Sequence, residues 1–128
     1  SEIQWENYII GVLKNLIEKR KLLINGFKCL IDGDLPIGAG ISSSSSLICG
    51  FIKGLDKLNN LNLTNNDIIN IAREVEHNFI GLTGGIMDQS TILNGKKNKV
   101  LLIDCKNRSF DFIDSDFGRY KFLLLNTV

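Results

Sequence analysis

A short run rich in glycine and serine, residues 36–46, most constrains what this chain can fold into. It reads Pro-Ile-Gly-Ala-Gly-Ile followed by five consecutive serines, and apolar segments stand on both sides of it. Glycine reaches positive φ and allows close approach to the backbone, because it has no Cβ. Successive N–H groups and the N-terminus of a following helix then offer positive partial charge to an anion, and serine hydroxyls add hydrogen bonds. The run therefore predicts a loop that binds a phosphate chain.

A flexible linker is the alternative interpretation, because glycine and serine also make flexible tethers. The run is short, however, and apolar residues flank it closely at 27–31 and 47–52. The only proline of the chain, Pro36, stiffens its entrance. Since the run contains no lysine and lacks the Walker A spacing, we favour phosphate binding by a loop of another kind.

Length, charge and cysteine content exclude several classes of protein. The length of 128 residues fits one globular domain or less. The formal net charge of +1 gives no sign of the basic patch that binds nucleic acid. No apolar stretch is long enough to span a bilayer, and the N-terminus lacks the pattern of a signal peptide. Cys29, Cys49 and Cys105 are widely spaced, so we expect buried, reduced thiols rather than disulfides or zinc ligands. These features predict a cytoplasmic protein.

Hydrophobic periodicity predicts a mixture of helices and strands. Apolar residues recur at helical spacing over residues 5–17, 47–58 and 64–80, and the second of these helices starts inside the serine run. Thr64 and Asp67 predict a capping box at the start of the third. A turn at 81–85 and a short helix from Asp88 follow. We expect strands at 27–34, 99–105, 109–113 and 120–127. This order predicts the α+β fold class.

The third predicted helix carries a carboxylate on its apolar face. At about 100° per residue, Glu76 falls inside the apolar stripe of that helix. The stripe consists of Ile68, Ile69, Ala72, Val75, Phe79 and Ile80. A carboxylate facing a core is unfavourable unless a cation or hydrogen-bond donors meet it. Glu76 is therefore expected to have a partner, either a lysine or arginine at the edge of the core or a bound metal ion. His77 falls on the polar side, where we expect it to be solvated.

A second carboxylate follows a pair of glycines. The string Thr-Gly-Gly-Ile-Met-Asp-Gln at 83–89 describes a tight turn that projects Asp88. Asp88 is either the N-cap of the next helix, a role that aspartate often fills, or a base or substrate anchor. Spacing alone favours the cap.

The two ends of the sequence suggest a segment of a longer protein. It begins at Ser1 rather than methionine and ends on the apolar residues 122–128. A strand there would present an unpaired edge. We expect further chain beyond the 128 residues.

Two of these motifs together resemble the GHMP small-molecule kinases, and within them the galactokinases. The motifs are residues 36–46 and the string Gly-Ile-Met-Asp-Gln at 85–89, and their galactokinase-like forms are this string and the triple serine at 42–44. Further similar segments follow the same order, at 5–8, 33–36, 76–77 and 102–105. The resemblance implies the α+β fold of these kinases. That fold would comprise part of their N-terminal lobe, which is like domain 2 of ribosomal protein S5, and the start of the second lobe.

The resemblance also implies a role for each motif. The loop would bind the phosphates of ATP through Gly38, Ala39, Gly40, Ile41, Ser42, Ser43 and Ser44. Ser44 and Glu76 would hold Mg²⁺, which takes few protein oxygens and completes its shell with phosphate and water. Asp88 would be the catalytic base that accepts the proton of the anomeric hydroxyl as this oxygen attacks the γ-phosphoryl group. Gly85 would offer its backbone to the sugar.

Some features depart from the pattern of these kinases. Ser45 stands where they usually have alanine, and Gly84 where cysteine is frequent. Their N-terminal sugar-binding segment, the arginine that assists the aspartate, and their C-terminal glycine-rich motif do not occur in the 128 residues. The resemblance thus implies the central portion of a kinase, inactive by itself, with a phosphate loop at 36–46, a catalytic loop at 83–89 and closing strands at 99–127.

Four functions remain open. The first is transfer of phosphate from ATP to the C1 hydroxyl of galactose. The second is the same chemistry on another sugar, such as N-acetylgalactosamine or arabinose. The third is a non-catalytic sensor that binds ATP and galactose and then engages a protein, and the fourth is a degenerate remnant that binds nothing. Because the serine loop, Glu76 and Asp88 are all present, we favour the enzyme, with a small sugar as its partner and neither nucleic acid nor membrane. The oligomeric state is left open.

Overall fold

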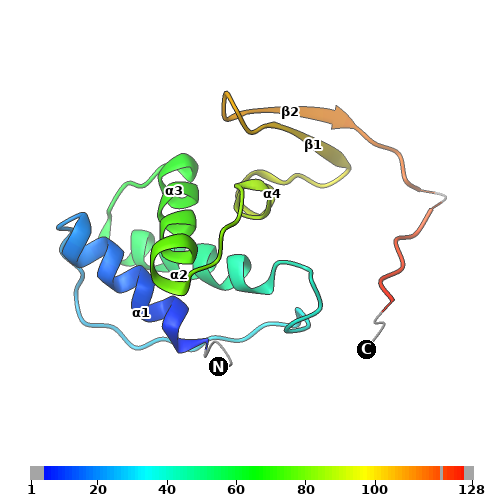
Figure 1. The fold of residues 1–128 in the computed structure, drawn as a ribbon. Helices are drawn as coiled ribbons and strands as arrows, with labels where there is room; N and C mark the ends of the chain where they lie inside the picture. The colour runs from blue at the N-terminus through cyan, green and yellow to red at the C-terminus, as the bar shows by residue number, and fades with distance from the viewer. Residues whose placement is uncertain (1–4, 119, 126–128) are drawn as a thin grey trace.

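A computed structural model describes residues 5–118 and 120–125 of the chain. This part contains four α-helices followed by a two-stranded antiparallel sheet (Figure 1). Two of the helices end in a π-helical segment. The elements in order are α1 (Glu6–Lys14), η1 (Asn15–Lys19), α2 (Ser43–Asn59), α3 (Asn65–Val75), η2 (Glu76–Ile80), α4 (Met87–Asn94), β1 (Lys99–Asp104) and β2 (Ser109–Asp114). The α+β fold class is confirmed, and so are the four predicted helices.

The start of α3 shows why local sequence was enough to place the helices. Thr64 is its N-cap, and the Oγ1 of Thr64 accepts a hydrogen bond from the backbone N–H of Asp67 at 3.1 Å. The Asp67 carboxylate accepts one in return from the backbone N–H of Thr64 at 2.9 Å. This is the predicted capping box, and the hydrogen bonds from Thr64 lower the pKa of Asp67.

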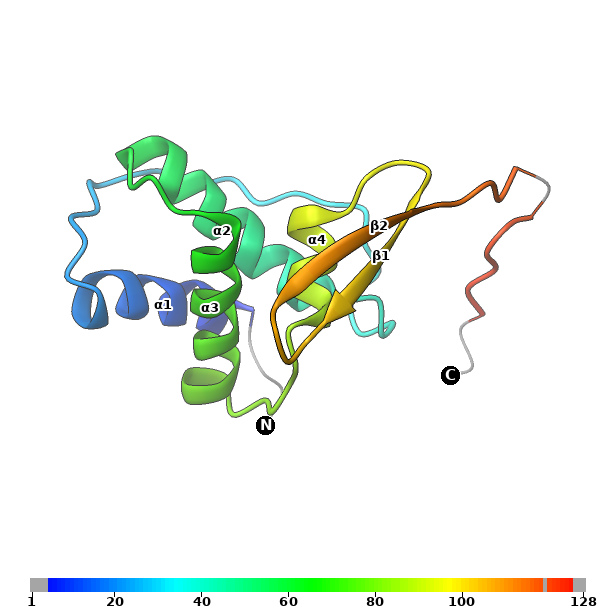
Figure 2. The ribbon, with the colours of Figure 1, turned by 90° about the horizontal axis from the view of Figure 1, so that it is seen from above.

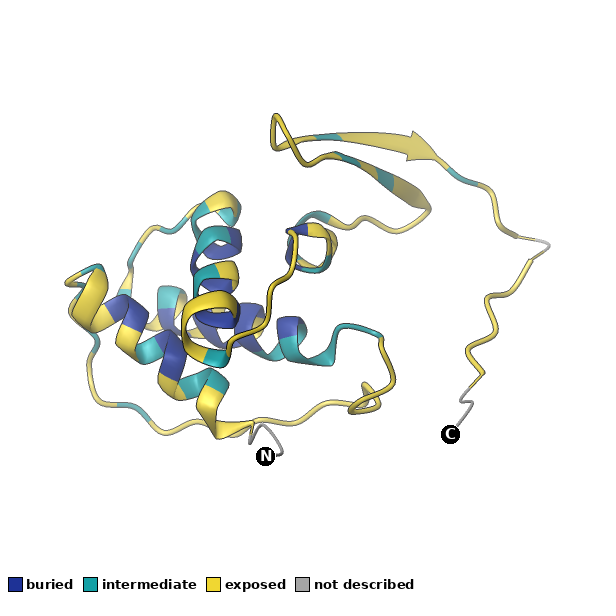
Figure 3. Ribbon diagram, in the orientation of Figure 1, coloured by how far each residue is buried: buried dark blue, intermediate teal, exposed yellow. Residues whose placement is uncertain are grey.

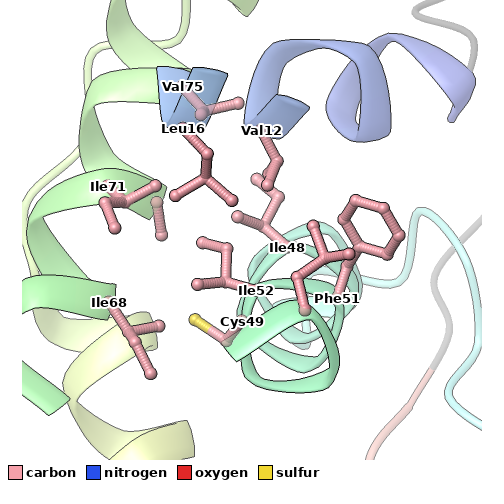
Figure 4. Close-up of a cluster of buried hydrophobic side chains, with 11 residues drawn as sticks. Val12, Leu16, Ile48, Cys49, Phe51, Ile52, Ile68, Ile71 and Val75 are labelled. Atoms are coloured by element: carbon pink, nitrogen blue, oxygen red, sulfur yellow. The ribbon is translucent and has the colours of Figure 1, made fainter. Parts of the chain in front are cut away.

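The hydrophobic core lies between α1, α2 and α3 (Figure 3). Each helix presents one apolar stripe to it, and Figure 4 shows these side chains pointing toward one another. The cluster consists of Val12, Leu16, Ile48, Cys49, Phe51, Ile52, Leu55, Ile68, Ile71, Ala72 and Val75. At Gly11 the helices approach so closely that an added Cβ would lie 2.8 Å from side-chain atoms of Val75 and Phe79.

The strands β1 and β2 form a hairpin that lies beside α4, as both Figure 1 and Figure 2 show. Its register pairs Lys99 with Asp114 at the open end and Asp104 with Ser109 at the turn. The carboxylate of Asp104 accepts hydrogen bonds from the backbone N–H groups of Lys106 and Asn107, which closes the turn. The predicted strands at 99–105 and 109–113 are confirmed.

Two other predicted strands are wrong. Residues 27–34 and 120–125 are irregular, whereas positions 126 and 127 lie outside the described residues. A strand exists only when its backbone pairs with a neighbour, and within the described residues these two segments have none. Leu30 is 93% exposed and Phe122 is 82% exposed, so their apolar character is not used for packing here.

The three cysteines differ in how far they are buried. All three cysteines are free thiols, as expected, but only Cys49 is buried. The expectation of burial is wrong for Cys29 and Cys105, which lie outside the helical core.

None of the helices in the described part of the chain combines the length and the apolarity that crossing a membrane requires.

Candidate functional site

The glycine-serine loop turns sharply before it enters α2. Three of its residues have positive φ, namely Gly38 at 75°, Gly40 at 70° and Ser42 at 63°. Two of these are the glycines, where positive φ carries no Cβ penalty. Positions 36–40 are exposed and 41–44 are half-buried, so the outer part of the loop is open to solvent.

The first turn of α2 leaves its backbone donors without helical partners. The first helical hydrogen bond runs from the N–H of Ser46 to the carbonyl of Ser42 at 3.0 Å. The N–H groups of Ser43, Ser44 and Ser45 precede it, and the N-cap Ser42 makes no side-chain capping bond. Together with the positive end of the helix dipole, such donors suit a phosphate group.

Glu76 is buried, as the sequence predicts, but it is met by neutral donors. It begins η2 and is 7% exposed. Its Oε1 accepts a hydrogen bond from the Oγ of Ser45 at 2.7 Å, and its Oε2 accepts one from the Nε2 of Gln89 at 2.5 Å. Among the described residues no lysine or arginine pairs with it. The alternative of a lysine or arginine partner is therefore wrong for this part of the chain, because serine and glutamine on neighbouring helices fill that place.

Burial raises the pKa of the Glu76 carboxyl, and the negative charge of Asp88 raises it further. The hydrogen bonds from Ser45 and Gln89 act in the opposite direction without cancelling the rise in pKa. Burial, with a contribution from Glu76, also raises the pKa of Cys49 to about 12, so that thiol stays protonated. The negative charge of Glu76 is thus only partly compensated within the described residues.

Two buried polar side-chain atoms of α4 have no hydrogen-bond partner among the described residues. One is the Oε1 of Gln89, on the residue that donates to Glu76, and the other is the Oγ of Ser90. Gln89 is 2% exposed and Ser90 is fully buried. Such atoms are rare in folded proteins, and the one on Gln89 belongs to a residue that contacts Glu76.

Asp88 is the second residue of α4 and is half-buried. The N-cap of this helix is Ile86, and no side chain caps it. The capping interpretation of Asp88 is therefore wrong, since the helix begins two residues earlier than that role requires. Within the described residues the Asp88 carboxylate has no hydrogen-bond or ion-pair partner. Gly84 and Gly85, just before the helix, are exposed with open space around them.

The donor set is consistent with Mg²⁺ but not with a metal held by protein alone. In the part of the chain that is described, no three acidic, histidine or cysteine side chains gather around one point. Mg²⁺ prefers oxygen ligands and is commonly bound by one or two carboxylates together with substrate phosphates and water. A carboxylate has about four lone-pair positions, and Glu76 uses two of them for Ser45 and Gln89. Glu76 therefore keeps capacity for a metal ion.

The structure brings some predicted site residues together and leaves others apart. Glu76 contacts Ser45, whereas Ser44, the predicted magnesium ligand, is half-buried and makes no hydrogen bond to Glu76. His77 is exposed, as expected. A surface depression of about 870 Å³ beside the hairpin, lined by residues 98–100, 115–118 and Phe122, contains no predicted site residue.

Ser45 and Gln89 are two site residues to which the sequence interpretation gave no role. The spacing of both residues in the sequence nevertheless indicates that they are buried. Ser45 stands three and seven residues before Ile48 and Ile52, so it lies on the buried stripe of α2. Gln89 likewise lies three residues after Ile86, which is also buried. A polar residue on an apolar face indicates a buried partner.

Comparison with known proteins gives a consistent result. The model of a family described as GHMP kinases N terminal domain matches residues 7–96. A galactokinase from Clostridium perfringens is 41% identical over 126 residues, which are 98% of this chain and 33% of that protein. A galactokinase from Exiguobacterium sibiricum is 38% identical over 125 residues, 96% of this chain and 32% of that protein.

A solved structure is similar as well. The crystal structure of Lactococcus lactis galactokinase in complex with galactose superposes with a TM-score of 0.82 and 30% identity. The superposition covers 89% of this chain and 29% of that one. The chain thus spans about a third of the length of the curated relatives it matches.

Proposed function

Because residues 7–96 match its N-terminal domain, the chain belongs to the GHMP kinase family, and we propose that it is part of a galactokinase. The reaction is transfer of the γ-phosphoryl group of ATP to the anomeric C1 hydroxyl of galactose. The similarity to galactokinases along nearly the whole chain supports this substrate. The 128 residues form the central portion of the enzyme, with the phosphate loop at 36–46, the catalytic loop at 83–89 and a closing segment that contains the hairpin of β1 and β2. We place this enzyme in the cytoplasm.

One observation supports this function most strongly. The buried Glu76 carboxylate links the helix that follows the glycine-serine loop to the helix that carries Asp88, through Ser45 and Gln89. Two neutral donors compensate this buried carboxylate only in part, which favours a cation as its further partner. Phosphoryl transfer needs a phosphate loop and acidic groups of this kind. Here Asp88 directly precedes Gln89, the residue that donates a hydrogen bond to Glu76.

Each residue has a specific task in the proposed reaction. Backbone N–H groups of residues 38–44 bind the phosphates of ATP and hold them at the start of α2. Ser44 and Glu76 hold Mg²⁺, which when bound neutralises charge on the phosphate oxygens. Asp88 accepts the proton of the sugar hydroxyl, a contribution of about 10²–10⁴-fold for a general base. Gly85, which is exposed just before α4, offers its backbone to the sugar.

Two alternative functions use the same residues, one with a different sugar as substrate and one without turnover. A kinase for N-acetylgalactosamine or arabinose uses the same parts, because sugar selectivity depends on contacts outside these motifs. A sensor that binds ATP and galactose uses them without turnover. The intact loop and both carboxylates favour the enzyme over a sensor or a remnant.

The experiment that separates these functions measures ADP release by the full-length protein with each of the three sugars. We expect kcat/KM to be highest for galactose. A higher value for another sugar reassigns the substrate. Absence of ADP release, together with ligand-dependent binding of a protein partner, identifies a sensor, and absence of all ligand binding identifies a remnant.

A further inference from the structure

We propose that Ser45 and Gln89 are positioning residues, which orient the Glu76 carboxylate as a ligand of the magnesium–nucleotide complex. This inference rests on the proposed function, in which Glu76 holds Mg²⁺. Nothing in the resemblance to known kinases gives either residue a role. It is the set of hydrogen bonds around Glu76 that points to one.

The two donors fix the carboxylate from two sides. The Oγ of Ser45 reaches Oε1 at 2.7 Å, and the Nε2 of Gln89 reaches Oε2 at 2.5 Å. The Nε2 of Gln89 also lies 3.5 Å from the Oγ of Ser45, so the three groups are in mutual contact. Because each oxygen has its own donor, rotation about the terminal bond of the Glu76 side chain would break both hydrogen bonds. The unused lone pairs are thereby held in one direction.

The burial of this cluster is not explained by stability alone. Ser45 and Gln89 are each 2% exposed, and Glu76 is 7% exposed. Three polar side chains in such a place stabilise a fold less than apolar residues of the same size would, particularly when one polar atom, the Oε1 of Gln89, is left unsatisfied. Residues that orient a metal ligand by hydrogen bonding are a general feature of metal sites, and their loss typically weakens metal binding by about 10–100-fold.

The position of Gln89 links metal binding to the base. Gln89 directly follows Asp88 in the first turns of α4, so the side chain that holds Glu76 also anchors the backbone that carries Asp88. Ser45 holds Glu76 from the first turn of α2, next to Ser44. Because Gln89 also lies next to Asp88, we expect its loss to matter more than the loss of the Ser45 hydroxyl.

The test uses the full-length protein and a non-hydrolysable ATP analogue. The affinity of the Mn²⁺–nucleotide complex is measured by water proton relaxation, and the affinity of the nucleotide alone is measured in EDTA. Gln89→Met keeps the length of the side chain and removes the amide, and Ser45→Ala removes the hydroxyl, which Ser45→Thr restores. The matched control is Ser90→Ala, because Ser90 is buried on the same helix as Gln89 and has no hydrogen bond to Glu76.

We expect Gln89→Met to weaken binding of the Mn²⁺–nucleotide complex about tenfold and to leave metal-free nucleotide binding unchanged. Ser45→Ala should weaken it less, Ser45→Thr should recover it, and Ser90→Ala should match the unmodified protein. The Mg²⁺ concentration at half-maximal rate should rise for Gln89→Met, with most of kcat recovered at saturating Mg²⁺. A purely structural role would not produce a loss that depends on the metal.

Glu76→Gln separates failure of this inference from failure of the proposed function. If Glu76→Gln loses metal-dependent binding while Gln89→Met and Ser45→Ala retain it, Glu76 is a ligand that needs no positioning, and the inference is wrong. If Glu76→Gln binds the complex normally, the magnesium role of Glu76 is wrong and the inference falls with it. Circular dichroism checks the fold of each variant. Should Gln89→Met unfold, the comparison of Ser45→Ala with Ser45→Thr decides.

Discussion

The Oγ of Ser45 donates a 2.7 Å hydrogen bond to the Oε1 of Glu76, across 31 positions of sequence. It joins the first turn of α2, which follows the glycine-serine loop, to the end of the third helix. The loop and the buried carboxylate are consequently parts of one unit, and displacing one displaces the other. Gln89 extends this unit to α4 and thereby to Asp88. The predictions below test the unit and the helices that support it.

Asp88→Asn should lower kcat by about 10²–10⁴-fold and leave nucleotide affinity unchanged. The amide is close to the carboxylate in size but cannot accept the proton of the sugar hydroxyl. Steady-state rates and nucleotide titrations of the full-length protein measure the two quantities separately. If the variant keeps its kcat, Asp88 is not the base. Equal losses of kcat and nucleotide affinity would indicate a distorted site.

Glu76→Ala should abolish most of the stabilisation that Mg²⁺·ATP gives to the fold. A ligand at a hundred times its Kd stabilises a protein by about 2.7 kcal/mol, and a lost metal ligand raises that Kd. Thermal unfolding with and without Mg²⁺·ATP measures the effect. We expect the variant to remain folded without ligand. Unfolding of Glu76→Ala even in the absence of ligand would instead assign Glu76 a structural role.

Gly11→Ala should destabilise the fold by about 2 kcal/mol. The new Cβ would lie 2.8 Å from side-chain atoms of Val75 and Phe79, so the contact between α1 and the third helix must open. The matched control is Gly54→Ala, in the interior of α2, where nothing lies within 4 Å. That substitution should stabilise the helix by roughly 0.5–1 kcal/mol. Urea unfolding measures both, and equal effects of the two substitutions would contradict the close packing at Gly11.

Glu74→Gln should lower stability at neutral pH and not at acid pH. Burial acts to raise the pKa of Glu74, but hydrogen bonds from Asn15 and Lys19 and the charge of Arg20 hold it below its ordinary value of 4.5. A carboxyl with a lowered pKa in the folded state contributes stability above its ordinary pKa and loses it as the pH falls through the lowered pKa.

The free energy of unfolding should therefore differ by about 1 kcal/mol between the unmodified protein and Glu74→Gln at pH 7, and the difference should vanish in strong acid. Glu18→Gln is the control, since Glu18 is exposed and has no ion pair among the described residues. A pH-independent difference for Glu74→Gln would mean that packing, not charge, is responsible.

The sequence predicted the helices well because their signals are local. Apolar spacing and the Thr64–Asp67 capping box lie within single segments, and the structure confirms both. The strands predicted at 27–34 and over 120–125 are wrong because a strand depends on a partner elsewhere, which local sequence does not reveal. The hairpin at 99–114 succeeded because its two strands are neighbours in the chain.

The sequence predicted the charged residues of the candidate site better than it predicted the residues that contact them. The helical period alone predicted the burial of Glu76. It could not identify the partners, because Ser45 and Gln89 come from other helices and serine and glutamine carry no charge to suggest a pairing. Charge balance predicted either a lysine or arginine or a metal ion as the partner, whereas two neutral donors contact the carboxylate among the described residues.

The most direct measurement of the proposed function is a ³¹P NMR spectrum of the full-length protein with ATP, Mg²⁺ and galactose. We expect one new phosphate resonance that couples to the anomeric proton of the sugar, with ADP formed in equal amount. Release of ADP without a sugar phosphate, or a phosphate on any other carbon, would contradict it.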